Sequence, residues 1–155
     1  MPASKMREFL DSRGVRYVSI KHSPAFTAQE VAASAHVSGR DFAKTVIVVV
    51  DGHMAMVVLP AGRRIVLSDL RELLEKPNLR LATEVEFREA FPDCEVGAMP
   101  PFGNLYDMPV YVASALAEQP EIAFNAGSHV EVVKMAFDDF VEAVRPIVLD
   151  FVTTG

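Results

Sequence analysis

Hydrophobic residues recur at helical spacing in five segments of this chain, with polar residues between them. Ser, Thr or Asp stands at or near the start of these segments, and Gly or Pro follows several of them, as is typical of helix ends. The starts at Thr27 and Thr83 also carry a Glu three positions later, which is the pattern of a capping box. These patterns predict helices over residues 4–13, 27–39, 68–75, 83–91 and 138–144.

A run of β-branched residues over 44–50 gives the strongest strand signal, and Asp51-Gly52 joins it to a second apolar run over 53–59. An Asp-Gly pair between two such runs is typical of a type I′ hairpin. Because positions 46–50 are apolar without interruption, we expect the first strand to be covered on both faces and central in its sheet. Shorter extended segments are predicted over 16–20, 63–67, 109–112, 121–124 and 129–134.

The order of these elements predicts one α/β domain over residues 1–155. Helices and strands are interspersed without a regular βαβ alternation and hairpins are frequent, so we expect a mixed, partly curled sheet. No composition shift, internal repeat or low-complexity stretch marks a second domain. A chain of 155 residues, 50% of them hydrophobic, is long enough to bury its own core without disulfides or metals.

Composition and charge exclude several classes of protein. The apolar runs are too short to cross a bilayer, and the N-terminal residues lack the apolar core of a signal peptide, so we expect a cytoplasmic protein. The net charge of −6 disfavours indiscriminate binding along nucleic acid. A local basic patch is still compatible with this charge. Its candidate members, which could equally be ordinary solvated residues, are Arg40, Lys44, Arg63, Arg64 and Lys134.

Metal and nucleophile chemistry have little support in the sequence. The histidines His22, His36, His53 and His129 have no short ligand spacing to one another or to the single cysteine, Cys94, so no metal site is expected. Cys94 could act as a nucleophile, but no neighbouring base is evident, and a structural role is the simpler interpretation. Motifs of serine hydrolases, P-loop proteins and dinucleotide-binding folds are absent, and no cofactor is expected.

The stretch Gly97-Ala-Met-Pro-Pro-Phe-Gly103 has the composition of a rigid binding turn. Glycine at both ends allows backbone geometries closed to other residues, and the prolines Pro100 and Pro101 restrict the conformations between them. The remaining backbone amides could point at a carbonyl, carboxylate or phosphate of a ligand; they belong to Ala98, Met99, Phe102 and Gly103. The alternative is an ordinary tight connection between a helix and a strand.

Further polar residues lie at the ends of predicted strands, namely Lys44, Thr45, Asn125, Ser128 and His129. The Lys44 ammonium could bind phosphate as a point charge or act as a nucleophile if its pKa were lowered, although such a lysine is commonly just solvated. His129 could be an acid, a base or a ring donor, or a structural residue beside a turn. Ser128 has no evident activating partner.

Taken together and in this order, His22 and Thr27, Phe42-Ala-Lys-Thr45, the glycine-proline stretch and Asn125-Ala-Gly-Ser-His129 form a more specific pattern than any one of them. The chain resembles the YbaK/prolyl-tRNA synthetase-associated domain family of free-standing aminoacyl-tRNA deacylases, from about Lys5 to Val144. The resemblance implies a curled, barrel-like mixed sheet surrounded by helices. It also implies hydrolysis of the ester between a wrong amino acid and the terminal ribose of tRNA, with prolyl tRNA mischarged with alanine as the leading substrate.

The resemblance further implies roles for individual residues. Lys44 matches the lysine expected to hold the phosphate and ribose of the terminal nucleotide, Gly97 and Pro101 match the G-x-x-x-P turn, and Gly127 and His129 match a late glycine-histidine segment. Members of the family are thought to work without a metal and without a strong general base. The expected catalytic residues are Lys44, Gly97, Pro101 and His129, and the expected substrate-binding residues are His22, Thr27, Thr45, Ala98, Met99, Phe102, Gly103, Gly127 and Ser128.

The implied partner is the acceptor end of aminoacyl-tRNA, with prolyl-tRNA synthetase or an elongation factor as a further partner. The chain departs from the family pattern at Ala113, where many relatives carry an aspartate. The absence of that aspartate leaves open the alternative that the protein is a binding module without catalytic activity. A third interpretation is a Schiff-base enzyme that uses Lys44 on small carbonyl compounds.

Overall fold

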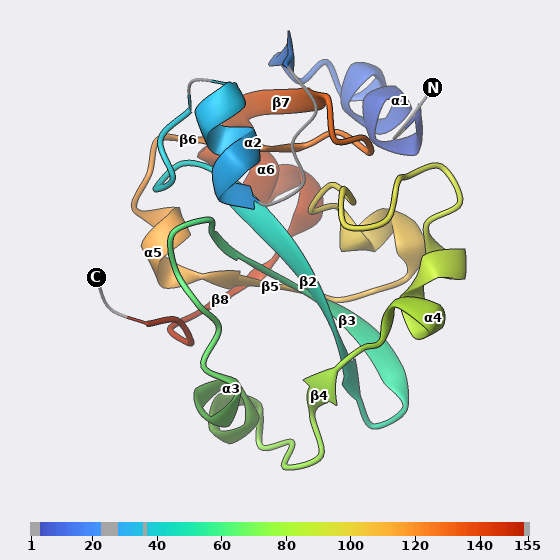
Figure 1. Ribbon diagram of the computed structural model, residues 1–155, viewed down its shortest axis with the longest axis vertical. Helices are drawn as coiled ribbons and strands as arrows, with labels where there is room; N and C mark the ends of the chain where they lie inside the picture. Colours follow the sequence, from blue (N-terminus) through green and yellow to red (C-terminus); the bar gives the residue numbers. More distant parts are fainter. Residues whose placement is uncertain (1–3, 23–27, 36, 154–155) are drawn as a thin grey trace.

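The computed structural model describes residues 4–22, 28–35 and 37–153 of the chain (Figure 1). The helices are α1 (Ser4–Ser12), α2 (Ala28–Ser34), α3 (Leu67–Leu74), α4 (Glu84–Phe87), α5 (Ser114–Ala117) and α6 (Phe137–Val144), with the 3₁₀ turns η1 (Arg88–Ala90) and η2 (Gly103–Tyr106). The strands are β1 (Tyr17–Lys21), β2 (Ala43–Val50), β3 (His53–Pro60), β4 (Arg80–Leu81), β5 (Val110–Ala113), β6 (Glu121–Asn125), β7 (Glu131–Ala136) and β8 (Ile147–Leu149).

The strands form two sheets. The larger sheet is mixed, with the order β4-β2-β3-β5-β8, and the smaller is antiparallel, with the order β1-β7-β6. A single parallel bridge between Phe42 and Ala123 links the two sheets. The prediction of an α/β domain with a mixed sheet is confirmed.

The barrel-like detail of that prediction is wrong, because neither sheet closes within the described residues. Closure would need a continuous ladder between the sheets, but among the described residues the two sheets pair only at the bridge, just before β2 begins. The strong twist of the β2–β3 hairpin, visible in Figure 1, carries β2 away from β6.

The β2–β3 hairpin is confirmed in detail. Its register ends in the pair Val50 and His53, and the two turn residues, Asp51 and Gly52, have φ angles of +51° and +79°. A type I′ turn needs positive φ at both central positions, which Asp-Gly supplies at little strain. The predicted central position of β2 is also confirmed, since β3 and β4 flank it.

Apolar side chains cover both faces of the larger sheet. Ile47 and Met56 belong to a core shared with α1, α6 and the smaller sheet, whereas Val48 and Val57 pack with Leu70 of α3 on the other face. This alternation explains the uninterrupted apolar run in β2, because successive side chains enter different cores.

Two predicted helix starts have different outcomes. The Thr83 capping box is present, with Glu86 N donating to Thr83 Oγ1 at 3.3 Å and Thr83 N donating to Glu86 Oε1 at 2.8 Å. The helix that it starts ends at Phe87, earlier than predicted, and continues as η1. The capping box proposed at Thr27 lies outside the described residues. No helix in the described part of the chain is long and apolar enough to cross a membrane.

Candidate functional site

Hydrogen bonds join two loops that lie far apart in the sequence, the proline loop (residues 95–103) and the glycine turn (residues 125–129). Glu95 N donates to Gly127 O at 2.7 Å, and Gly127 N donates to Ala98 O at 2.9 Å. His129 N donates to the Glu95 carboxylate at 2.8 Å. The structure therefore brings together the two glycine motifs that the sequence singles out.

The glycines at the centre of this contact have backbone conformations that favour glycine. Gly97 has a φ of +84° and Gly127 a φ of +88°. A Cβ atom on Gly97 would lie 3.6 Å from Nε2 of His129, an ordinary van der Waals contact. The requirement for glycine at position 97 therefore comes from backbone strain, while the short distance shows that the imidazole lies against the Gly97 backbone.

The Glu95 carboxylate orients His129 through two contacts. Its Oε1 accepts the His129 backbone N–H and lies 3.1 Å from ring atom Nδ1. A carboxylate at Nδ1 favours the tautomer with the proton on Nδ1, which makes Nε2 the acceptor nitrogen of a neutral ring. Glu95 was not among the predicted site residues; the available signal was an acidic residue two positions before the Gly97 turn.

The backbone amides of the proline loop divide into two groups. Ala98 N donates to Glu95 O at 3.0 Å and Phe102 N donates to Pro100 O at 2.8 Å, so these two amides are used inside the loop. Among the described residues, the amides of Met99 and Gly103 have no hydrogen-bond acceptor. They are the two predicted donors that remain for a ligand.

The proline loop is anchored in the core through Phe102. This side chain is fully buried and makes edge-on ring contacts with Phe9, Phe124 and Phe140. Pro101 and Met99 are buried as well. The Phe102 side chain thus serves packing and is not available to a ligand.

Gly103 closes the loop by tight packing. A Cβ atom at this position would lie 2.8 Å from Val110 Cγ2 and 3.0 Å from the Met108 carbonyl oxygen. Gly103 is therefore required because the loop returns close to the start of β5.

The start of β2 lies beside the end of β6. Phe42 pairs with Ala123, and Ala123 N donates to Asp41 O at 3.0 Å. From this parallel bridge, two further residues along each strand lead to Lys44 and to Asn125, so these positions are at the same level. Lys44, at the start of β2, therefore lies at the level of Asn125, the last residue of β6 before the glycine turn.

Lys44 is a partly buried cation. Burial lowers the pKa of its ammonium group, and the positive charge of Arg64 lowers that pKa further. Within the described residues, Lys44 takes part in no ion pair. An anion at this position would relieve both effects, which suits Lys44 to phosphate binding.

Two polar atoms near these strand ends are buried without hydrogen bonds within the described residues, Oγ1 of Thr45 and Oδ1 of Asn125. Asn125 is 9% exposed. Buried polar atoms are usually satisfied, so atoms without a partner point to a bound molecule or ordered water. Thr45 was predicted as a substrate-binding residue, and the structure adds Asn125.

His22 and Ser128, two further predicted residues, lie at or beside the glycine turn. His22 N donates to Val130 O at 2.9 Å, which extends the β1–β7 pairing and brings His22 next to the turn. Ser128 is buried, and its hydroxyl accepts the Val130 amide at 3.4 Å. Thr27 lies outside the described residues.

Cys94 lies beside an acidic and a phenolic side chain. Its Sγ lies 3.7 Å from Oδ1 of Asp93 and 3.8 Å from the hydroxyl of Tyr106, which itself donates to Asp93 at 2.8 Å. Burial raises the pKa of Tyr106. Activated thiols lie beside cations, so this arrangement favours a structural role.

The described residues contain no group of three or more His, Cys, Asp or Glu side chains that could hold a metal ion.

Ala113, at the end of β5, is fully buried with Val57 and Leu59. Lys134 pairs with Glu121 at 3.5 Å on the smaller sheet.

Comparison with known proteins relates these observations to a family. The family model described as aminoacyl-tRNA editing domain matches residues 22–143. A solved structure of the hypothetical protein APE2540 is 27% identical, with a TM-score of 0.85 and coverage of 97% of this chain and 100% of that chain. No curated protein sequence matches.

A solved structure of a candidate trans-editing enzyme for prolyl-tRNA synthetase is 23% identical, with a TM-score of 0.81 and coverage of 99% and 97%. At this identity the likeness concerns the fold. The region matched by the family model begins at His22 and includes both the proline loop and the glycine turn.

Proposed function

Because this chain belongs to the aminoacyl-tRNA editing domain family, we propose that it is a deacylase that hydrolyses the ester of mischarged tRNA. The observation that carries the proposal is the hydrogen-bonded contact between the proline loop and the glycine turn. The position of Lys44 at the level of Asn125, which leads into the glycine turn, supports it. Prolyl tRNA mischarged with alanine is the substrate that we place first. The similarity to a candidate trans-editing enzyme for prolyl-tRNA synthetase supports this choice.

The chemistry is hydrolysis of an activated ester. Water adds to the carbonyl carbon, the tetrahedral oxyanion collapses, and the bond to the ribose oxygen breaks to give free amino acid and tRNA. The amides of Met99 and Gly103 would donate to the developing oxyanion, and one such donor commonly accelerates a reaction by about 10²–10³-fold. Positioning of the ester and the attacking water supplies the rest of the rate acceleration, and a hydroxyl of the substrate helps to activate the water.

Lys44 and His129 have separate roles in this proposal. The Lys44 ammonium holds the phosphate and ribose of the terminal nucleotide, where its own unfavourable burial is compensated. His129, oriented by Glu95, fixes the proline loop from the side of Gly97. Thr45 and Asn125 offer buried polar atoms to the substrate.

Selectivity follows from the size of the amino acid. A small site admits alanine and rejects larger side chains by steric clash, which is the principle of a second sieve after a synthetase. This predicts faster release of alanine than of proline from the same tRNA.

The deciding experiment measures deacylation of alanyl-tRNA and prolyl-tRNA that carry the same proline anticodon, followed by a panel of other mischarged tRNAs. Preferential release of alanine supports the substrate proposal. Release of an amino acid from a different mischarged tRNA would support the deacylase activity but assign it another substrate. Absence of release from every member of the panel overturns the deacylase.

A binding module without chemistry is the second candidate, and the buried Ala113 favours it. If the aspartate that many relatives carry here orients the site, its replacement by a small apolar residue removes that support. This candidate predicts affinity for tRNA ends, or for a synthetase or elongation factor, without hydrolysis.

A further inference from the structure

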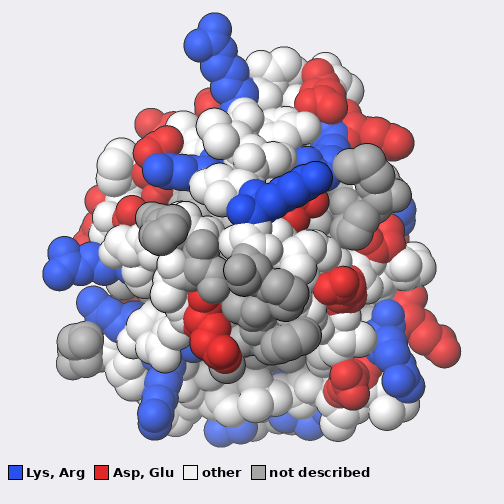
Figure 2. Space-filling view, turned by 45° about the horizontal axis from the view of Figure 1, so that its top comes forward, with Lys and Arg blue, Asp and Glu red and all other residues white. Residues whose placement is uncertain are grey.

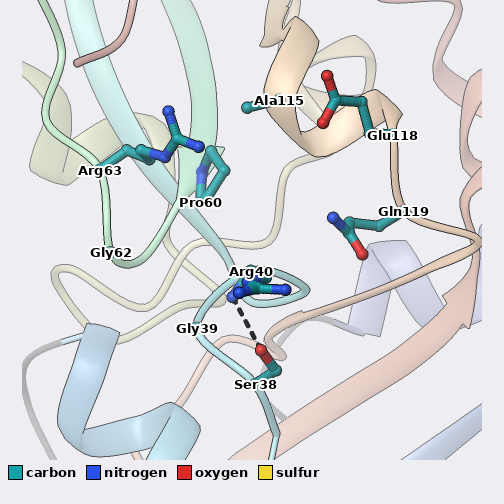
Figure 3. A pocket seen from close by; sticks show the side chains of 9 residues that line it. All are labelled: Ser38, Gly39, Arg40, Pro60, Gly62, Arg63, Ala115, Glu118 and Gln119. Atoms are coloured by element: carbon teal, nitrogen blue, oxygen red, sulfur yellow. Dashed lines mark hydrogen bonds between the residues drawn. The ribbon is translucent and has the colours of Figure 1, made fainter. Parts of the chain in front are cut away.

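A cleft lies at the open end of the β2–β3 hairpin (Figure 3). This arginine cleft has a volume of about 660 Å³ and is formed by residues 38–40, the segment that follows β3, and α5 with the residues after it. The side chains that matter for its chemistry are Arg40, Arg63 and Glu118. The proposed deacylase mechanism uses none of them.

The arginine cleft is continuous with the end of the hairpin that carries Lys44. Its wall includes Pro60, which pairs with Ala43, and Ala61 N donates to Phe42 O at 2.8 Å. Arg40 precedes Lys44 by four residues, so at most about 14 Å separates their Cα atoms. One flexible polyanion could therefore contact both.

The two arginines of the cleft are available to an anion. Arg40 is exposed, lies in the cleft in Figure 3, and takes part in no ion pair within the described residues. Arg63 donates through Nη1 to Thr153 O at 2.7 Å, which fixes its side chain and leaves other N–H groups of the guanidinium. A guanidinium group donates in a planar fork that matches phosphate oxygens.

Positive charge forms no broad patch on the described part of the face shown in Figure 2. Figure 2 shows Lys and Arg side chains interspersed with Asp and Glu, and neither sign covers that face. The mixed charges of the described residues on that face do not form a broad cationic surface, which agrees with the net charge of −6. A small cationic group made of Arg40, Arg63, Arg64 and Lys44 can still bind one or a few phosphates.

Building on the proposed function, we propose that the arginine cleft binds a backbone phosphate of the tRNA acceptor strand, upstream of the nucleotide held by Lys44. An open cleft admits a strand that enters and leaves it, and two arginines at its rim supply the donors. The Glu118 carboxylate, on the opposite wall, limits the attraction.

The test compares two substrates with Arg40→Ala, Glu118→Gln and a control, Arg16→Ala. Arg16 is an exposed arginine before β1, so its replacement removes the same charge outside the cleft. The long substrate is full-length mischarged tRNA, and the short substrate is aminoacyl-adenosine without an acceptor stem. Arg40→Ala should raise KM for the long substrate roughly tenfold at unchanged kcat, as expected for loss of a charge-assisted hydrogen bond.

Glu118→Gln should lower KM for the long substrate, and no variant should change hydrolysis of the short one. The slope of log affinity against log salt should fall in Arg40→Ala by about 0.7 to 0.9. Equal KM values for wild type and Arg40→Ala on the long substrate, or equal changes on both substrates, would overturn the cleft assignment.

Binding of uncharged tRNA separates the cleft from the deacylase proposal. If wild type hydrolyses neither substrate, the proposed function fails, but Arg40→Ala should still weaken binding of uncharged tRNA and Arg16→Ala should not. Displacement of tRNA by inorganic phosphate at equal molar concentration would instead show a site for a free anion and would also overturn the proposal.

Discussion

One carboxylate oxygen of Glu95 accepts the backbone N–H of His129 and lies 3.1 Å from ring atom Nδ1 of the same residue. This pair connects the proline loop to the glycine turn, and it holds the imidazole beside the Gly97 backbone. Placement of groups is the basis of the proposed deacylase, so the pair should matter for catalysis more than for stability.

Replacement of Glu95 should therefore reduce kcat. In Glu95→Ala both contacts are lost, and misplacement of the site can lower kcat by up to about 10²-fold. Glu95→Gln keeps an acceptor oxygen without the charge and should fall between Glu95→Ala and wild type. Glu89→Ala, at another exposed glutamate, is the control. Wild-type kcat in Glu95→Ala would remove His129 orientation from the mechanism.

Gly97→Ala should destabilise the fold by about 1–2 kcal/mol, because alanine is strained at a φ of +84°. The new methyl group meets His129 at an ordinary distance, so strain and not a clash is the expected cause. Gly62→Ala is the matched control, since a Cβ there meets nothing within 4 Å and φ is not positive. Urea denaturation measures both, and equal midpoints would contradict the strain argument.

Lys44→Met should make the protein more stable at pH 7 while abolishing activity. The pKa of Lys44 is lowered in the folded state, so folding disfavours its charged form at neutral pH. As the pH rises through the lowered pKa toward the ordinary value of 10.5, wild type loses this disadvantage. The stability difference between variant and wild type should therefore narrow with rising pH.

Urea denaturation of both proteins between pH 7 and pH 10.5 measures this difference. Groups that change protonation equally in both proteins make no contribution to it. A wild type that is the more stable protein at pH 7 would show that the ammonium has a stabilising partner. Lys44→Arg keeps the charge and should retain part of the activity, because it can still contact phosphate.

Thr45→Val should separate binding from stability. The Thr45 hydroxyl is buried without a partner, so a methyl group of the same shape should leave the free energy of unfolding equal or raise it by up to about 1 kcal/mol. The KM for mischarged tRNA should rise if the hydroxyl contacts substrate. Thr83→Ala is the contrasting control, since loss of that N-cap typically costs about 1 kcal/mol. An unchanged KM would show that the Thr45 hydroxyl does not contact the substrate.

Local patterns in the sequence predicted those parts of the structure that depend on neighbouring residues. Asp51-Gly52 specifies a hairpin because its two residues tolerate positive φ, and Thr83 with Glu86 caps a helix within four residues. The glycine and proline spacing likewise located both loops of the site. Each of these features is decided by contacts within a few positions of the chain.

Several features that depend on distant contacts were not predicted. Glu95 gains its role only because the glycine turn, more than thirty residues away, folds against it. The openness of the sheets depends on the separation of β2 from β6 after one bridge, which no local pattern encodes. The arginine cleft joins Arg40, Arg63 and Glu118 from three separate segments, and their spacing along the chain carries no motif.

The anchoring of the proline loop through Phe102 has a consequence for heat inactivation. Since this ring belongs to the same aromatic cluster as Phe9, Phe124 and Phe140, the loop cannot melt ahead of the domain. Activity and tertiary structure should then be lost at the same temperature, without an inactive intermediate that keeps its tertiary packing.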